Sequence, residues 1–352
     1  MSDIRAGHAV LLMRYNGGMK ILVFDADAAV REIFGKQLVG NQIVYFDTHV
    51  SSETLSAHAD AEVVSMFVAS SFSKEHIDLL PNLKCIAARS TGVDHIDVAY
   101  ARGKGIEVCN VPRYGAHTVA EFTFALLLSL SRRIPEATHQ VREDGDFRTE
   151  ALEGFDLFGK TIGIIGTGAI GRNVASIAQG FGMEVRLFDH HPDTGLEGEH
   201  ARYVSMEELL ASSDIVTLHV PASAENKHML GKAELEKVKR GAYIINTARG
   251  ELIDPEALLE ALKSGQVAGA GIDVLEEERV LKDEMELVKG IESIHALKSL
   301  IRDHILVDMP RVVVTPHIAF FSREAYHEIL STTAENIIAF VSGTPKNVVA
   351  TP

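Results

Sequence analysis

The sequence predicts an α/β protein made of two doubly wound parallel-sheet domains. The chain has 352 residues, which exceeds one ordinary domain and is enough for two domains of roughly 150 to 200 residues. Short apolar runs alternate with helical patterns, as they do in parallel βαβ units. This alternation occurs in two separate series. We therefore expect two sheets with a cleft between them, and ligands bind such sheets at the carboxyl ends of the strands.

The first series of alternating elements ends near Cys109. Its apolar runs are short, rich in β-branched residues and separated by polar segments, which favours strands. The predicted strands span residues 21–24, 43–46, 63–67, 85–88 and 107–109.

The second series begins at Thr161. Its predicted strands span residues 161–165, 185–188, 215–220, 242–245, 267–274 and 312–315. One helix between them has clear ends, with Asp254 as N-cap, Pro255 at the first helical position and Gly265 just past the last turn.

Two long helical patterns, at 117–133 and 323–340, lie outside the two series. We expect them to carry the chain from the first domain to the second and back, which makes the first domain discontinuous. The predicted substrate domain comprises residues 1–113 and 320–352, and the predicted nucleotide-binding domain comprises residues 114–319.

Composition excludes several classes of protein. Apolar residues make up 46% and charged residues 24%, which is typical of soluble globular proteins, and no run approaches the ~20 apolar residues of a membrane span. A net charge of −15 without a Lys/Arg block disfavours nucleic acid as a partner. The two cysteines, Cys85 and Cys109, favour a reducing compartment. We expect a cytoplasmic protein without membrane or nucleic-acid partners.

Two segments carry no cofactor motif. Residues 279–310 form a polar, amphipathic insertion that we interpret as a surface helix or a subunit contact. Its apolar residues at roughly helical spacing are Leu281, Met285, Leu297, Leu300 and Ile301. Residues 1–18 lack a signal-peptide pattern, and we interpret them as an extension or an alternative start.

A dinucleotide-binding fingerprint follows the first strand of the second series. The sequence Gly-Thr-Gly-Ala-Ile-Gly at 166–171 follows a predicted strand and opens a predicted helix, which is the context that gives a GxGxxG pattern its meaning. Gly166 permits a tight turn, Gly168 lets the backbone approach a pyrophosphate, and Gly171 lets the helix pack on the strand. The amides of Ala169 and Ile170 then lie at a helix N-terminus, which favours an anion.

Asp189 ends the next predicted strand, 18 residues after Gly171, close to the expected spacing of ~20. Its carboxylate would accept hydrogen bonds from the adenosine ribose hydroxyls and would repel a 2′-phosphate. No arginine follows it directly, since residues 190–192 are His-His-Pro. The predicted cofactor is NAD rather than NADP.

An arginine, a carboxylate and a histidine follow later strands of this series. Arg249 would hold a substrate carboxylate through two parallel hydrogen bonds. His317 would exchange a proton with the carbonyl that is reduced, and an acidic neighbour would raise the pKa of its imidazole. On spacing alone, Glu276, Glu277 and Glu278 are all candidates for that neighbour. These groups suit the reduction of a 2-oxo acid by a nicotinamide, and no metal-ligand set is expected.

Residues 19–340 resemble the D-isomer-specific 2-hydroxyacid dehydrogenase family. The resemblance rests on the fingerprint and on three further motifs: Asn-Thr-Ala-Arg-Gly-Glu-Leu-Ile-Asp at 246–254, Gly-Ile-Asp-Val-Leu-Glu-Glu-Glu at 271–278 and Thr-Pro-His at 315–317. It implies a Rossmann NAD-binding domain, a flavodoxin-like substrate domain and a homodimer. The family's catalytic glutamate falls five positions after the aspartate of the second of these motifs, which selects Glu278 and places Asp273 near the nicotinamide.

Within the family the chain is most similar to the D-lactate dehydrogenase branch. The residues that show this are Arg-Ser-Thr-Gly-Val-Asp-His-Ile-Asp at 89–97, Asn-Val-Pro-Arg-Tyr at 110–114 and His-Ile-Ala-Phe-Phe at 317–321. The resemblance implies that the amides of Thr91 and Gly92 bind the substrate carboxylate and that Tyr114 and Phe320 line a small pocket; the alternative for these two is hinge packing. It also implies cofactor contacts by Val220, Pro221, Asn226, Thr247 and Ala248.

We therefore predict NAD-dependent reduction of a small 2-oxo acid, pyruvate first, to the D-2-hydroxy acid. The predicted homodimer uses the apolar segment 122–130. Glyoxylate or hydroxypyruvate reduction is the nearest alternative among enzymes. An NAD-gated corepressor-like binding protein is the alternative from another class, because that scaffold retains the arginine, glutamate and histidine.

Overall fold

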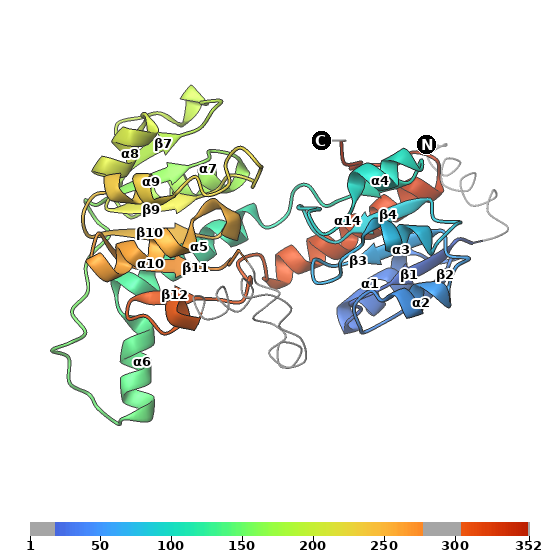
Figure 1. The fold of residues 1–352 in the computed structure, drawn as a ribbon, viewed down its shortest axis with the longest axis horizontal. Helices are drawn as coiled ribbons and strands as arrows, with labels where there is room; N and C mark the ends of the chain where they lie inside the picture. Colours follow the sequence, from blue (N-terminus) through green and yellow to red (C-terminus); the bar gives the residue numbers. More distant parts are fainter. Residues whose placement is uncertain (1–17, 277–303, 351–352) are drawn as a thin grey trace, which may run out of the picture. The chain divides into compact units, whose positions relative to one another are not determined.

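The computed structural model describes residues 18–276 and 304–350, and the chain divides into two units. Unit 1 comprises Met1–Tyr114 and Ser322–Pro352, and unit 2 comprises Gly115–Phe321. Each unit has one parallel sheet with helices on both faces (Figure 1). The predicted fold class, two parallel-sheet α/β domains, is confirmed.

The sheet of unit 1 has five strands in the order β2-β1-β3-β4-β5, all parallel. The strands are β1 (Lys20–Val23), β2 (Gln42–Tyr45), β3 (Val63–Met66), β4 (Cys85–Ala88) and β5 (Glu107–Cys109). The strands β3 and β4 are buried along their whole length, which explains why their sequences are apolar except for Ser65.

Helices cover both faces of this sheet. Leu55, Ile77 and Val98 pack on one face in a common core. They belong to α2 (Ser52–Ser56), α3 (Lys74–Asp78) and α4 (Val98–Gly103). Helices α1 (Ala28–Gln37) and α14 (Arg323–Val341) contact each other, and α14 also packs on β4. The last helix of the chain therefore completes the first unit (Figure 1).

The sheet of unit 2 has seven parallel strands in the order β12-β11-β10-β9-β6-β7-β8. The strands are β6 (Thr161–Ile165), β7 (Glu184–Phe188), β8 (Ala201–Tyr203), β9 (Ile215–Leu218), β10 (Ala242–Asn246), β11 (Val267–Ile272) and β12 (Val312–Val314). The order reverses at β6, so β6 and β9 flank the point where ligands bind such sheets. The edge strand β8 was not predicted, because three residues with one buried side chain give almost no periodic signal.

Two separate cores hold helices on the two faces of this sheet. Helices α5 (Ala116–Ser131) and α7 (Ala169–Gly180) pack on one face. The other face is covered by α8 (Met206–Ser212), α9 (Lys232–Lys237) and α10 (Pro255–Ser264). Helix α6 (Ile134–Glu143) has no buried residue. No described helix is long and apolar enough to cross a membrane.

Helix α10 begins and ends where its sequence predicts. The carboxylate of Asp254 accepts hydrogen bonds from the amides of Glu256 at 2.9 Å and Ala257 at 3.2 Å. Gly265 terminates the helix with φ 68°, a left-handed conformation that glycine adopts without strain. Both ends depend on local residues, so sequence alone places them.

The expected dimer segment 122–130 contributes to the core of unit 2. Four of its residues, Phe124, Leu126, Leu127 and Leu130, are at most 6% exposed and pack under the sheet of their own unit. Phe122 and Leu128 of the same segment are only partly buried against this core, and the subunit interface stays a prediction. Residues 279–303 of the expected insertion lie outside the described part, and with them its five apolar residues.

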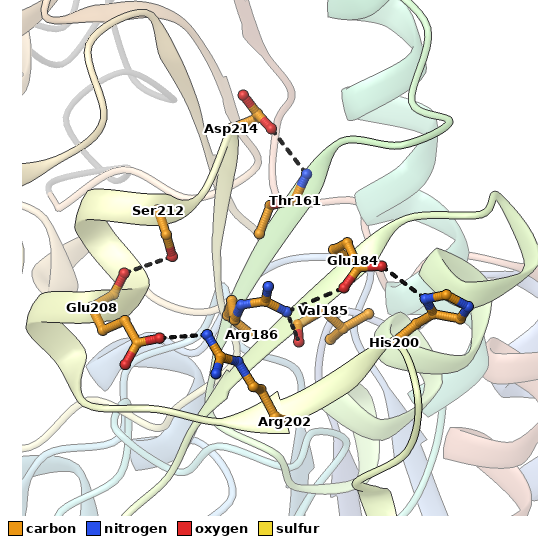
Figure 2. Close-up of polar contacts among 9 residues, drawn as sticks. All are labelled: Thr161, Glu184, Val185, Arg186, His200, Arg202, Glu208, Ser212 and Asp214. Atoms are coloured by element: carbon orange, nitrogen blue, oxygen red, sulfur yellow. Dashed lines mark hydrogen bonds and ion pairs between the residues drawn. The ribbon is translucent and has the colours of Figure 1, made fainter.

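Polar contacts at the amino-terminal edge of the unit 2 sheet tie neighbouring elements together (Figure 2). The carboxylate of Asp214, just before β9, accepts the amide of Thr161 at 2.9 Å and the ammonium of Lys239 at 2.7 Å. Glu184, at the start of β7, pairs with His200 at 2.7 Å. Away from this edge, Arg202 of β8 pairs with Glu208 of α8 at 2.7 Å.

Candidate active site

The predicted site residues of unit 2 follow the carboxyl ends of its strands. Gly166 follows β6, Val220 follows β9 and Arg249 follows β10, while Asp273 and His317 follow β11 and β12. Strands β10, β11 and β12 are direct neighbours. The sheet therefore delivers the arginine, the aspartate and the histidine side by side along one edge.

The glycine fingerprint forms a close turn between β6 and α7. Gly166 has φ 94°, and a Cβ there would lie 2.6 Å from the carbonyl oxygen of His219. A Cβ on Gly171 would lie 1.9 Å from the carbonyl oxygen of Gly166, so only glycine allows the helix to begin this close to the strand. A Cβ on Gly168 would meet nothing within 4 Å. Gly168 is the N-cap of α7, so the amides of Ala169 and Ile170 open the helix beside free space, as an anion requires.

Asp189 follows β7 and joins this turn. Its Oδ2 accepts the amide of Thr167 at 2.7 Å and the Thr167 hydroxyl at 3.1 Å, and its Oδ1 accepts the amide of His191 at 2.9 Å. Burial opposes the charge, but these hydrogen bonds prevail and lower the pKa of Asp189. A carboxylate offers about four acceptor positions. The charged group therefore keeps room for a ribose hydroxyl at Oδ1.

The loop after β9 is closed by Asn226. Its Nδ2 donates to the carbonyl of Pro221 at 2.8 Å, and its Oδ1 accepts the amide of Ser223 at 2.7 Å. Asn226 thus shapes the loop that begins at Val220. His219, just before this loop, is half-buried, but its Nδ1 is buried without a hydrogen-bond partner among the described residues, and this desolvation lowers its pKa to about 3. A pKa this low favours the neutral imidazole near pH 7, which makes His219 a poor candidate for the proton donor.

The loop after β10 carries Arg249 and is fixed from within. Asn246 is 1% exposed; its Nδ2 donates to the carbonyl of Arg249 at 2.8 Å, and its Oδ1 accepts the amide of Ala248 at 3.0 Å. The Thr247 hydroxyl lies 3.0 Å from that of Thr123, which itself donates to the carbonyl of Val119. A hydroxyl has one proton to donate, and Thr123 donates it to Val119, so Thr247 is the donor in the hydrogen bond between the two threonines.

Asp273 is a buried hub at the edge of the sheet. It is 1% exposed, and its Oδ1 accepts the Thr315 hydroxyl at 2.6 Å and the amide of Ile318 at 2.9 Å. Its Oδ2 accepts the amide of Ala319 at 2.8 Å. Burial raises the pKa of Asp273, although these donors and the charge of His317 act against it. The hub holds the loop that carries His317.

His317 stands in the left-handed region, with φ 55°, where a non-glycine residue is uncommon and often functional. Its amide donates to the carbonyl of Asp273 at 2.9 Å. Its ring meets that of Phe320 edge-on, with centroids 6.3 Å apart, and Phe320 meets Phe321 at 5.7 Å. The histidine and the aromatic pair therefore form one local cluster.

Glu276 is not the partner of His317. Its Oε1 lies 2.9 Å from Nζ of Lys227 and 3.1 Å from Nε2 of His228. Burial alone would raise its pKa, but these two contacts lower it. Glu276 is thus engaged with the loop after β9, which removes one of the three glutamates that spacing left open. Glu277 and Glu278 lie outside the described residues.

In unit 1 the predicted carboxylate-binding loop follows β4. Its carbonyl oxygens are all occupied: Ser90 O accepts the amide of Val111 at 2.9 Å, Thr91 O accepts Asn110 Nδ2 at 2.7 Å, and Gly92 O accepts Ser90 Oγ at 2.6 Å. The amides of Thr91 and Gly92 donate to no group within residues 18–276 and 304–350. Tyr114 is half-buried and is the last residue of this unit.

Several residues that support the site residues were not predicted from the sequence. Thr315 and the amides of Ile318 and Ala319 surround Asp273, and Thr123 supports Thr247. Only the position of Thr315 directly before Pro316-His317 hinted at a role. In the described part, no three His, Cys, Asp or Glu side chains are arranged to hold a metal ion.

Comparison with known proteins identifies the family. Residues 124–319, more than half of the chain, match the family described as D-isomer specific 2-hydroxyacid dehydrogenase, NAD binding domain. The 2-hydroxyacid dehydrogenase homolog 1 of Schizosaccharomyces pombe is 38% identical over 332 residues, which cover 92% of this chain and 97% of that protein. The chain belongs to the D-isomer-specific 2-hydroxyacid dehydrogenase family.

Two other members show the range of relatives. The glycerate dehydrogenase of Methylorubrum extorquens is 40% identical over 276 residues, covering 77% of this chain and 80% of that protein. The D-lactate dehydrogenase of Aquifex aeolicus, solved with NAD and lactic acid, is 31% identical and superposes with a TM-score of 0.83, covering 94% of this chain and 99% of that one.

The matched region is the family's NAD-binding domain, so NAD is the cofactor of this dehydrogenase. The described residues fit it. The amide-lined turn at 166–171 suits the pyrophosphate, and the charged carboxylate of Asp189 suits a ribose without a 2′-phosphate.

Proposed function

We propose that this dehydrogenase reduces a small 2-oxo acid, pyruvate first, to the D-2-hydroxy acid. The observation that carries the proposal is the common edge of β10, β11 and β12, which follow one another in the sheet and are followed by Arg249, Asp273 and His317. A carboxylate-binding cation and a proton donor at one strand edge are the two protein groups that this reaction needs.

In this proposal each residue has one task. Arg249 holds the substrate carboxylate, and the amides of Thr91 and Gly92, which have no other acceptor among the described residues, bind it as well. NADH supplies the hydride when it is bound. His317 donates the proton to the carbonyl oxygen, and Glu278 is the acidic partner of its imidazole. Asp273 fixes the loop that positions His317.

Pyruvate is our first choice of substrate because the relative solved with lactic acid covers nearly the whole chain. Aromatic and apolar side chains next to His317, namely Phe320, Phe321 and Ile318, favour a methyl group over a hydroxymethyl group. Hydroxypyruvate is the main rival, because the M. extorquens relative is named for glycerate, the hydroxy acid formed from it.

The test is NADH oxidation, followed by nicotinamide absorbance, with pyruvate, glyoxylate, hydroxypyruvate and phenylpyruvate in parallel. We expect the highest kcat/KM with pyruvate. His317→Ala should lower kcat by ~10²- to 10⁴-fold, whereas His139→Ala, an exposed histidine of α6 in the same unit, should leave it unchanged.

Other outcomes have definite meanings. A higher kcat/KM for hydroxypyruvate would replace pyruvate as the substrate. Tight NADH binding without turnover of any of the four acids would contradict the dehydrogenase proposal and favour the corepressor-like alternative. Unchanged kcat in His317→Ala would remove His317 as the proton donor.

We further propose a cytoplasmic homodimer. Cys85 and Cys109 are both free thiols, which agrees with a reducing compartment. We expect its interface to include the apolar segment 122–130, in which Phe122 and Leu128 are only partly buried. Sedimentation equilibrium of the purified protein decides between a dimer and a monomer.

A further inference from the structure

Unit 1 buries one arginine at the carboxyl edge of its sheet. Arg89 directly follows β4 and is 1% exposed. Its Nη2 donates to the carbonyls of Phe24 at 2.6 Å and Asp25 at 3.0 Å, and its Nη1 donates to Ser65 Oγ at 3.4 Å. In this sheet β3 lies between β1 and β4. The side chain therefore crosses the end of β3 and fastens β4 to β1.

The backbone that receives Arg89 is itself held in an unusual shape. Asp25 has φ 50°, in the left-handed region. Its Oδ2 accepts the amide of Phe67 at 3.1 Å and the hydroxyl of Ser70 at 2.9 Å, both in the segment after β3. The ends of three strands thus form one hydrogen-bonded layer with the guanidinium at its centre.

Stability alone is a poor reason for this arrangement. Burial lowers the pKa of Arg89, which the charge of Asp25 partly offsets, and a buried charge costs free energy even when it is hydrogen-bonded. Apolar replacements of buried ionic groups are often neutral or stabilising. A role in positioning neighbouring backbone groups explains why a charged side chain is buried here.

The loop that follows Arg89 supplies such a role. Arg89 is the residue before Ser90, and its amide donates to the carbonyl of Met66 at 2.9 Å. The loop is anchored on its other side by Val111 and Asn110. With one anchor on each side, the amides of Thr91 and Gly92 have a fixed direction.

We propose that Arg89 is a positioning residue for substrate binding, which aims the amides of Thr91 and Gly92 at the substrate carboxylate by fastening the end of β4 to the ends of β1 and β3. This inference rests on the proposed function, because it takes the ligand of the loop to be a 2-oxo acid. Arg89 does not touch the substrate. Its loss should weaken carboxylate binding, while the proton donor on unit 2 keeps its local geometry.

The experiment compares Arg89→Met and Arg89→Lys with Arg102→Met. Arg102 also lies in unit 1 and pairs with Glu107 at 2.6 Å, at the opposite edge of the sheet. We expect Arg89→Met to raise KM for the 2-oxo acid ~10- to 100-fold, with kcat and the Kd of NADH little changed. Arg89→Lys keeps the cation and should raise KM less, and Arg102→Met should not change KM.

Two readouts separate positioning from general damage. Oxamate, an unreactive analogue of pyruvate, should bind the NADH complex of Arg89→Met more weakly by the same factor as the rise in KM. A folded Arg89→Met with unchanged KM, or with kcat lowered at unchanged KM, would overturn the inference. If neither arginine variant folds, Ser65→Ala removes only the 3.4 Å contact; a small rise in KM supports the role and an unchanged KM overturns it.

Failure of the inference is distinct from failure of the proposed function. A wild-type protein that turns over no 2-oxo acid and does not bind oxamate refutes both, because the loop then has no such ligand. A wild-type protein that is active, beside an Arg89→Met variant with the same KM, refutes only the role of Arg89.

Discussion

Unit 1 and unit 2 each bury a charged side chain at the carboxyl edge of the sheet, but the charges are opposite. Arg89 in unit 1 and Asp273 in unit 2 are both 1% exposed. The guanidinium donates to two strand-end carbonyls, whereas the carboxylate accepts two loop amides and a hydroxyl. A strand end offers both kinds of backbone group. A cation therefore ties strand ends together, and an anion gathers the amides of a following loop around itself.

The largest effect should come from replacing each of these two charged side chains by a neutral one. Asp273→Asn turns an NH₂ group toward groups that donate to Asp273, and we expect a loss of about 2–4 kcal/mol in the free energy of unfolding together with a lower kcat. Arg89→Met leaves the carbonyls of Phe24 and Asp25 without this donor. We expect a smaller loss in the free energy of unfolding than for Asp273→Asn, because a buried carbonyl without a partner is tolerated better than a buried amide without one. Urea unfolding measures the free energy of unfolding of both variants. A larger loss in Arg89→Met than in Asp273→Asn would contradict the expected order of the two effects.

A smaller effect isolates one hydrogen bond of the unit 2 hub. Thr315→Val keeps the shape but removes the hydroxyl that lies 2.6 Å from Asp273 Oδ1, and we expect a loss of about 1–2 kcal/mol because the acceptor is charged. The matched variant is Thr333→Val in α14 of unit 1, where the buried hydroxyl donates to the neutral carbonyl of Ile329 at 2.8 Å. Thermal unfolding should show the smaller loss in Thr333→Val. Equal losses would mean that the charge of Asp273 adds nothing.

The smallest effect concerns the opposite edge of the unit 2 sheet (Figure 2). Burial opposes the charge of Asp214, but its bonds from Lys239 and Thr161 prevail and lower its pKa below 3.8. A carboxyl whose pKa is lower in the folded state adds stability above its unfolded pKa, and this is lost as pH falls through the folded pKa. Asp214→Asn should therefore lose about 1 kcal/mol near pH 7 and less below pH 3.8.

The control for that prediction is Glu184→Gln, at the same edge. Its bond from His200 lowers the pKa of Glu184, but the pair is exposed to solvent, where such pairs contribute little. We expect an unchanged unfolding midpoint at neutral pH. A loss equal to that of Asp214→Asn would show that the edge behaves as one network.

The fold was predictable where local residues define an element. The caps of α10 and the glycine turn at 166–171 depend on neighbours within a few residues, so their sequences suffice. Strand β8 was missed because a three-residue edge strand has too few positions to show a period. The sequence of segment 122–130 could not separate core positions from interface positions, because an apolar helix face looks the same whether it faces a core or a subunit.

The candidate site was also predictable from the sequence only in part. The order of the motifs predicted which residues follow the strands, but spacing alone left Glu276, Glu277 and Glu278 equivalent. The contacts of Glu276 with Lys227 and His228 separate it from the others, and they join residues 48 or more positions apart. No periodicity in the sequence reports such a pairing.

By itself, the sequence determined that this protein has two parallel α/β units, a glycine turn for NAD and a row of strand-end residues suited to 2-oxo acid chemistry. The tertiary structure decided which charges are buried and what holds them. Arg89 reaches a carbonyl 65 positions away and Asp273 receives a hydroxyl from 42 positions away. Such partners depend on which strands become neighbours in the sheet, and that order is set by packing of the whole unit rather than by any local pattern.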